Sequence, residues 1–289
     1  MSAKDAEETA AGPDERGGAP AEVVAQAKVR APTRGNRRLE ALLEAVNADP
    51  ELRGWWHMAQ VMSERLGMSD HSWVHVQIVL NISLRILRLL VRAGIEPAMV
   101  ADHRMGRRDA EVVVASGALL HDVGMSIHRA DHEDYSLFLA ERKLRELLDG
   151  LYDEPERTVV ASEALHTIIG HRRRGEPYTV EAGVVRVADA LDMAQGRSRV
   201  PVEAGRMGIH ALSAAAIDEV TIEAGEDRPV RLEIRMNNSA GIFQVDDLLA
   251  TKLRGTPLER HVEVVATVEG ETEKRLLREF RLPEEPESR

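Results

Sequence analysis

The sequence contains no cysteine, few aromatic residues and fewer basic than acidic residues. Without cysteine the chain has neither disulfide bonds nor thiolate ligands, so any transition-metal site must use histidine, aspartate and glutamate. An aromatic content of 3% leaves little surface for stacking unpaired bases. The formal net charge of -11 argues against bulk nucleic-acid binding, although a few arginines could still hold a small phosphorylated substrate.

A long hydrophobic run is also missing. No apolar run reaches the ~18 residues that a membrane span needs, and the N-terminus lacks a hydrophobic signal core. We therefore expect no membrane association and a cytoplasmic location. The hydrophobic content of 43% and charged content of 30% are typical of a soluble globular protein.

The composition and the hydrophobic pattern of the sequence change along the chain. Residues 1–35 mix alanine, glycine, proline and both charge signs without apolar periodicity, which predicts a disordered tail. Residues 36–204 show helical periodicity almost throughout, including a buried helix that ends at Gly124, and predict an all-α bundle. Residues 205–283 predict a small α+β domain of unknown role, and residues 284–289 a solvated acidic tail.

Within the α+β domain, alternation of apolar and charged residues predicts the strands. "VRLEIRM" at 230–236 shows it most clearly, and the segments at 220–225, 261–270 and 273–282 are similar. The segment 242–255 between them has a helical pattern. Two ordinary domains fit within the 289 residues.

Eight of the eleven histidines fall between positions 71 and 171. His75 shares a helical face with Val79 and Ile82, where a lone histidine is more often a hydrogen-bonded core residue than a ligand. His71 lies one turn earlier, at the helix start, where capping or solvent exposure is expected.

His121 and Asp122 follow the apolar run "VVVASGALL", so both are expected to be buried. Burying an unpaired carboxylate is costly, and a divalent metal would satisfy both side chains at once. An Asp122–arginine pair is the alternative. Asp189 also lies on an apolar helix, and Asp192, nearer its polar end, is the weaker candidate.

The order His, His-Asp, Asp, with the motifs "LLHDVG" and "RVADALD", resembles the HD superfamily of metal-dependent phosphohydrolases over about residues 70–200. The resemblance implies an all-α bundle in which the catalytic metal is bound by His75, His121, Asp122 and Asp189. It also implies that His121 and Asp122 form the catalytic centre.

The chain is most similar to HD domains of the ribonuclease Y and HD-GYP type, which bind a second metal. The segments "DHEDYSLFLAERK" and "LHTIIGH" carry this similarity and imply His132 and His171 as further ligands. The sequence departs from these relatives in having Arg172 after His171, and Met125 where a lysine is common. The HD-GYP specificity motif is absent, so cyclic dinucleotide cleavage is not implied.

Two other histidines are weaker candidates. His166 precedes His171 by five residues, about 140° around the helix, so both cannot face one metal. His128 lies in a predicted turn, where we expect it to face solvent.

A metal held by imidazoles and carboxylates lowers the pKa of bound water from ~15.7 toward ~7. We therefore expect a phosphohydrolase that cleaves a nucleotide or phosphodiester by a metal-bound hydroxide, with Asp122 bridging if two metals bind. One or two ions of Mn, Fe, Co, Ni, Zn or Mg would suit these ligands. The predicted contacts to substrate phosphate are Arg172, Arg197 and Arg199.

Two alternative functions stay open at this point. The first is a regulatory, ligand-sensing protein with an HD fold, because the α+β domain lies outside the resemblance. The second is an RNA-processing nuclease related to ribonuclease Y, which the acidic balance and the low aromatic content disfavour. A homo-oligomer is compatible with all three functions.

Overall fold

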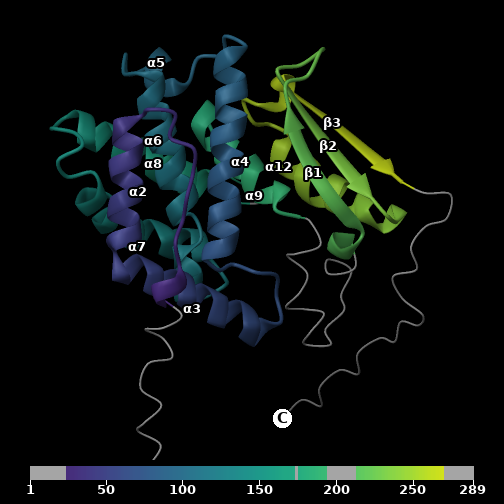
Figure 1. Cartoon of the computed structure of the whole chain (residues 1–289), viewed down its shortest axis with the longest axis horizontal. Coiled ribbons are helices and arrows are strands. Elements are labelled where there is room, and N and C mark those ends of the chain that lie inside the picture. Colours follow the sequence, from purple (N-terminus) through teal and green to yellow (C-terminus); the bar gives the residue numbers. More distant parts are fainter. Residues whose placement is uncertain (1–23, 173–174, 194–212, 270–289) are drawn as a thin grey trace, which may run out of the picture.

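The computed structural model describes residues 24–172, 175–193 and 213–269. Within these ranges a helical bundle stands beside a small sheet, on the side of the bundle formed by helices α4 and α9 (Figure 1). The expectation of an all-α bundle followed by a small α+β domain is therefore confirmed.

The bundle contains helices α2 (Arg37–Ala48), α3 (Pro50–Leu66), α4 (Trp73–Arg92), α5 (Ala98–Ala101), α6 (Arg107–Leu120), η2 (Val123–Ser126), α7 (His132–Leu147), α8 (Glu156–Gly170) and α9 (Val180–Leu191). Four of these helices have an N-cap residue whose side chain accepts a hydrogen bond from a backbone amide in the first turn: Asn36, Asp49, Ser72 and Thr179. Such capping satisfies backbone donors that a helix leaves unpaired and sets where each helix starts.

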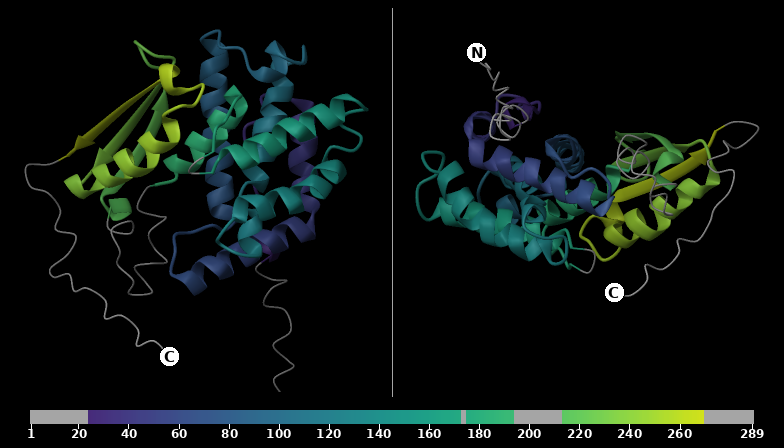
Figure 2. Two further views of the ribbon diagram at one scale, coloured as in Figure 1. Left: turned by 180° about the vertical axis from the view of Figure 1, so that it is seen from behind. Right: turned by 90° about the horizontal axis from the view of Figure 1, so that it is seen from below.

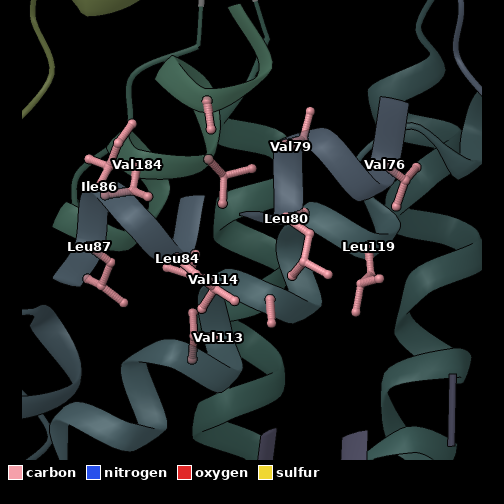
Figure 3. Packing of buried hydrophobic residues seen from close by; sticks show 14 of the residues in the cluster. Val76, Val79, Leu80, Leu84, Ile86, Leu87, Val113, Val114, Leu119 and Val184 are labelled. Carbon is pink, nitrogen blue, oxygen red and sulfur yellow. The ribbon is translucent and has the colours of Figure 1, made fainter. Parts of the chain in front are cut away.

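The core of the bundle lies between α4, α6 and α9. Figure 3 shows Leu80 and Leu84 of α4 beside Val114 of α6, and all three are buried. Each buried aliphatic side chain contributes about 1.5–3 kcal/mol to folding. By length and composition α4 could cross a membrane, with a mean hydropathy of 1.6, but its apolar face is already used by this core.

Helix α6 ends earlier than the sequence predicts. The predicted helix runs to Gly124, whereas α6 stops at Leu120 and the chain continues as the short 3-10 helix η2. A Cβ atom at Gly124 would overlap backbone atoms of His132 and Ser136, because this turn packs directly against the start of α7. The Gly124 amide donates to the Ser136 hydroxyl at 2.8 Å. This tertiary contact, absent from the local pattern, turns the chain away from the axis of α6.

Residues 213–269, called the C-terminal module below, form a three-stranded sheet with helical turns in the described part of the chain. The strand order is β1-β2-β3, with β1 antiparallel to β2 and β2 parallel to β3. The elements are β1 (Ile217–Glu223), β2 (Val230–Met236), η4 (Ser239–Gly241), the π-helix η5 (Gln244–Ala250), α12 (Thr251–Leu253), η6 (Glu259–His261) and β3 (Val262–Val268). The predicted strand at 273–282 lies outside the described residues.

The parallel pairing of β2 and β3 requires a crossover, which η5 and α12 provide. Figure 2 shows this helical segment lying along one face of the sheet, and both η5 and α12 contact α9. Leu258, which is fully buried, packs on Gly183 of α9, where a Cβ would approach its Cδ1 to 2.7 Å. The side chain of Arg85 on α4 donates to the carbonyl of Ile222 in β1.

The predicted N-terminal tail is too long. Ala27 and Val29 are buried against the bundle, and Val29 exchanges two hydrogen bonds of 2.9 Å with the side chain of Asn47. The segment from Val24 to Gly35 therefore belongs to the folded domain, because its two small apolar side chains find a place in the core. Residues 1–23 and 284–289 lie outside the described residues.

Candidate metal centre

Three helices bring the first group of site residues together. His75 comes from α4, and His121 and Asp122 follow the last residue of α6. The Nε2 atoms of His75 and His121 are 3.2 Å apart, and each is 3.4 Å from Asp122 Oδ2. Asp189 from α9 places its Oδ1 atom 3.4 Å from His75 Nε2 and 3.9 Å from His121 Nε2. The four predicted core ligands thus meet at one buried point.

The other oxygen of Asp122 faces a second group. His132, the first residue of α7, places Nε2 3.1 Å from Asp122 Oδ1, and His171, just after α8, places Nε2 3.6 Å from it. Two sets of potential metal ligands share Asp122: His75 and His121 on one side, His132 and His171 on the other, with each set's donor atoms within 4.8 Å of one another. The structure therefore brings all six predicted ligands together, with Asp122 between the two pairs of histidines.

Hydrogen bonds at the Nδ1 atoms direct the lone pairs of three imidazoles into the site. His121 Nδ1 donates to the carbonyl of Ala118 at 2.9 Å, and His171 Nδ1 donates to the carbonyl of Ile168 at 2.5 Å. His75 Nδ1 lies 2.6 Å from Asp192 Oδ2. These partners place the proton on Nδ1 and leave Nε2 as an acceptor.

This arrangement fits a divalent cation. With Nδ1 protonated, the Nε2 atoms of His75 and His121 are two acceptors that face each other at 3.2 Å, and a carboxylate oxygen stands beside them. Such a set of lone pairs repels itself unless a positive charge lies between its members. Neutral imidazole and carboxylate are ordinary ligands for divalent first-row metals.

The charge state of Asp122 also suits a ligand. Without a metal, protonated imidazoles supply the positive charge instead: burial alone would raise the pKa of Asp122, but the charge of protonated His121 and hydrogen bonds from His121, His132 and His171 hold it well below its usual range. Burial lowers the pKa of His171, whereas His132, although burial acts in the same direction, has its pKa raised by the hydrogen bond to Asp122. The shared carboxylate is therefore ionised at neutral pH.

Comparison with known proteins agrees with this geometry. The family model of the HD domain matches residues 75–194, a range that contains all six of these residues. The chain is 38% identical over 215 residues to the "uncharacterized protein MJ1020" of Methanocaldococcus jannaschii, which covers 74% of this chain and 83% of that relative. This chain belongs to the HD domain family. No solved structure matches it.

Membership of the family gives the bundle the fold of metal-dependent phosphohydrolases, and HD domains bind divalent metals. The more specific similarity to ribonuclease Y and HD-GYP domains stays a prediction. MJ1020 is itself uncharacterized, so it adds no substrate and no reaction.

Sequence reasoning underrated Asp192 of the HD domain. It follows α9 and is 7% exposed, and its contact with His75 Nδ1 orients the imidazole of this candidate ligand. The signal was present in the spacing, because Asp189 and Asp192 are three residues apart on the same helical face.

His71 was assigned wrongly to capping or solvent. Ser72 caps α4 instead, while His71 is 6% exposed and places Nε2 3.9 Å from Asp122 Oδ2. Its Nδ1 atom contacts the carbonyl of Ser69 at 2.7 Å. The four-residue spacing from His75 was the available signal, since residues at that spacing lie on one face of a helix.

The remaining predicted residues lie outside this cluster. His128 is exposed, as expected, and His166 accepts a hydrogen bond from the Tyr178 amide at 3.0 Å and stacks on that ring. Arg172 forms an ion pair with Asp134 of α7. Arg197 and Arg199 lie outside the described residues, so their contact with substrate phosphate stays a prediction.

Proposed function

We propose that this protein is a divalent-metal-dependent phosphohydrolase that cleaves a small phosphate ester, either a nucleotide or a phosphodiester. The observation that carries the proposal is the position of Asp122, whose two carboxylate oxygens face two separate groups of imidazole nitrogens. A shared carboxylate of this kind suits a pair of metals ~3.5–4 Å apart, the arrangement that many phosphatases and nucleases use.

In this proposal the two groups hold one metal each. His75, His121 and Asp189 would hold the first with Asp122 Oδ2, and His132 and His171 would hold the second with Asp122 Oδ1. When bound, the metals would supply an acidified water at neutral pH and positive charge for the phosphate. The metal is one of Mn, Fe, Co, Ni, Zn or Mg, because this donor set accepts each of them.

The protein itself positions the ligand imidazoles and shields them from water. Hydrogen bonds at Nδ1 fix the imidazoles of His75, His121 and His171 before any ligand arrives, so little reorganisation is needed on binding. His75 and His121 are fully buried, which strengthens electrostatic interactions with a phosphate at the site.

Charge indicates the size of the substrate. A net charge of -11 disfavours a long polyanion, while single cations near the site suit one or two phosphate groups. We assign Arg172, and Arg197 and Arg199 outside the described residues, to contacts with the substrate's phosphate oxygens. To bind the substrate, Arg172 would have to break its ion pair with Asp134, whose side chain is exposed. We retain a cytoplasmic location as part of the proposal.

The test is a screen of nucleotides and phosphodiesters against full-length protein stripped of metal and reloaded with each candidate ion. We expect hydrolysis of at least one class by the wild type and none by Asp122→Ala, with helix content by circular dichroism unchanged. Asp149→Ala is the control, because the side chain of Asp149 is 76% exposed and pairs only with Arg157 among the described residues. Turnover retained in metal-loaded Asp122→Ala would contradict the proposal.

A further inference from the structure

A lysine from the C-terminal module reaches the metal centre. Lys252 lies in α12, and its Nζ atom donates to Oδ2 of Asp189. The two side chains are only 16% and 12% exposed, so this ion pair is largely shielded from water. The other oxygen of the same carboxylate, Oδ1, faces His75 Nε2 at 3.4 Å.

The backbone of Lys252 is tied to the same region. Its carbonyl oxygen accepts a hydrogen bond of 2.9 Å from Nε of Arg186, which lies on α9 one turn before Asp189 and is 2% exposed. Nη1 of Arg186 donates to the carbonyl oxygens of Gly170, at 3.0 Å, and of Arg172. These two carbonyls flank His171, so one buried guanidinium joins α12 to the chain on both sides of a proposed ligand.

Packing holds α12 in this position. Leu253 and Leu258 are buried in the shared core, and Leu258 sits on Gly183 of α9 with no room for a Cβ between them. The backbone of Lys252 is therefore fixed by packing. An exposed lysine, by contrast, loses side-chain rotamer entropy when it forms an ion pair.

We propose that Lys252 is a positioning residue of the metal centre, and that the C-terminal module thereby completes the site of the HD domain. A carboxylate can rotate about its Cβ–Cγ bond, and an ammonium that holds Oδ2 keeps Oδ1 directed at the histidines. Partners of this outer kind orient metal ligands and typically change metal affinity when removed. The proposal rests on the proposed function in one respect, that Asp189 is a metal ligand.

The charge of Lys252 acts in the opposite direction, since an ammonium repels a nearby cation. The carboxylate of Asp189 lies between the two and neutralises the ammonium, so the orienting effect dominates. Loss of the lysine side chain is therefore expected to weaken metal binding.

The test is calorimetric titration of metal-stripped, full-length protein with Mn²⁺ alone. Lys252→Met, which keeps the length of the side chain and removes the ammonium, is expected to bind Mn²⁺ about 10–100-fold more weakly than the wild type. Lys252→Arg restores a donor to Oδ2 and is expected to recover most of the affinity. Arg254→Met is the matched control, because it removes one positive charge two residues away from a side chain that is 69% exposed.

A second background separates positioning from general damage to the fold. In Asp189→Asn protein, Lys252→Met is expected to cost no further Mn²⁺ affinity, because its effect passes through the carboxylate. An equal loss in both backgrounds would overturn the proposal, and so would unchanged or tighter binding by Lys252→Met. If Lys252→Met does not fold by circular dichroism, Lys252→Gln takes its place in the same cycle.

The outcome is independent of the proposed activity. A wild-type protein that binds Mn²⁺ and hydrolyses no phosphate ester would contradict the proposed function and leave the Lys252 result standing. A wild-type protein that is active, with a Lys252→Met variant of normal Mn²⁺ affinity, would contradict only the role of Lys252.

Discussion

Replacement of Asp192 by asparagine or alanine measures how strongly this carboxylate influences metal binding at Nε2 of His75, the nitrogen that we propose as a ligand. Asp192 Oδ2 lies 2.6 Å from His75 Nδ1, and the two residues are 7% and 0% exposed. The carboxylate keeps the proton on Nδ1, directs Nε2 into the site and makes it more basic. An asparagine side chain can still accept this hydrogen bond, but without the negative charge.

The expected loss follows from the strength of that bond. A hydrogen bond to a charged group contributes ~1.5–3 kcal/mol and a neutral one ~0.5–1.5 kcal/mol, so Asp192→Asn removes about 1–1.5 kcal/mol. At 1.4 kcal/mol for each factor of ten, metal affinity should fall by about tenfold. Asp192→Ala removes the acceptor as well and should approach a loss of ~100-fold.

The assay is calorimetric titration of the metal-stripped, full-length variants with Mn²⁺. Asp149→Asn is the control, because it removes the same charge from a side chain that is 76% exposed. The order of affinity should be wild type, Asp192→Asn, Asp192→Ala. Wild-type affinity in Asp192→Ala would refute the inference that this carboxylate tunes His75.

Two further predictions concern the second group of ligands. Gly124→Ala places a Cβ against the backbone of His132 and Ser136, so α7 must shift; we expect a loss of about 1–3 kcal/mol in the free energy of unfolding, measured with urea, and a loss of the second metal equivalent. The second prediction concerns pH. Burial lowers the pKa of His132, but its hydrogen bond to Asp122 raises that pKa, and the pKa of His132 lies above its ordinary value. Its contribution to stability is therefore fully present below about pH 6.5 and is lost as the pH rises through the raised pKa. In metal-stripped His132→Gln the unfolding free energy should decline less between about pH 6 and pH 9 than in the wild type, and an identical decline would contradict the assignment.

The six candidate ligands could be predicted from the sequence because ionisable residues are unusual within apolar helices. His121 and Asp122 follow a run of buried residues, and Asp189 lies in a helix whose residues from Glu181 to Leu191 are all buried. A buried charged group needs a partner of opposite charge or a metal, so an ionisable residue in an apolar segment predicts a contact with residues distant in the sequence. The helices of the bundle could be predicted because each buries one face, which places apolar residues at helical spacing in the sequence.

The features that the sequence did not reveal depend on contacts between distant segments. Lys252 meets Asp189 across 63 residues and from a separate module, and a lone lysine in a helical segment carries no signal of such an encounter. The end of α6 at Leu120 depends on the approach of α7 to Gly124. Val29 enters the core from a segment whose composition is typical of a disordered tail.

The central claim is that Asp122 joins two metal positions in one site. The most direct measurement is the number of metal ions bound per chain, determined by elemental analysis of reloaded, desalted protein for the wild type and for the double variant His132→Gln, His171→Gln. We expect two equivalents in the wild type and one in the double variant, because His75, His121, Asp122 and Asp189 remain intact in the latter. A single equivalent in the wild type, or two in the double variant, would contradict the claim.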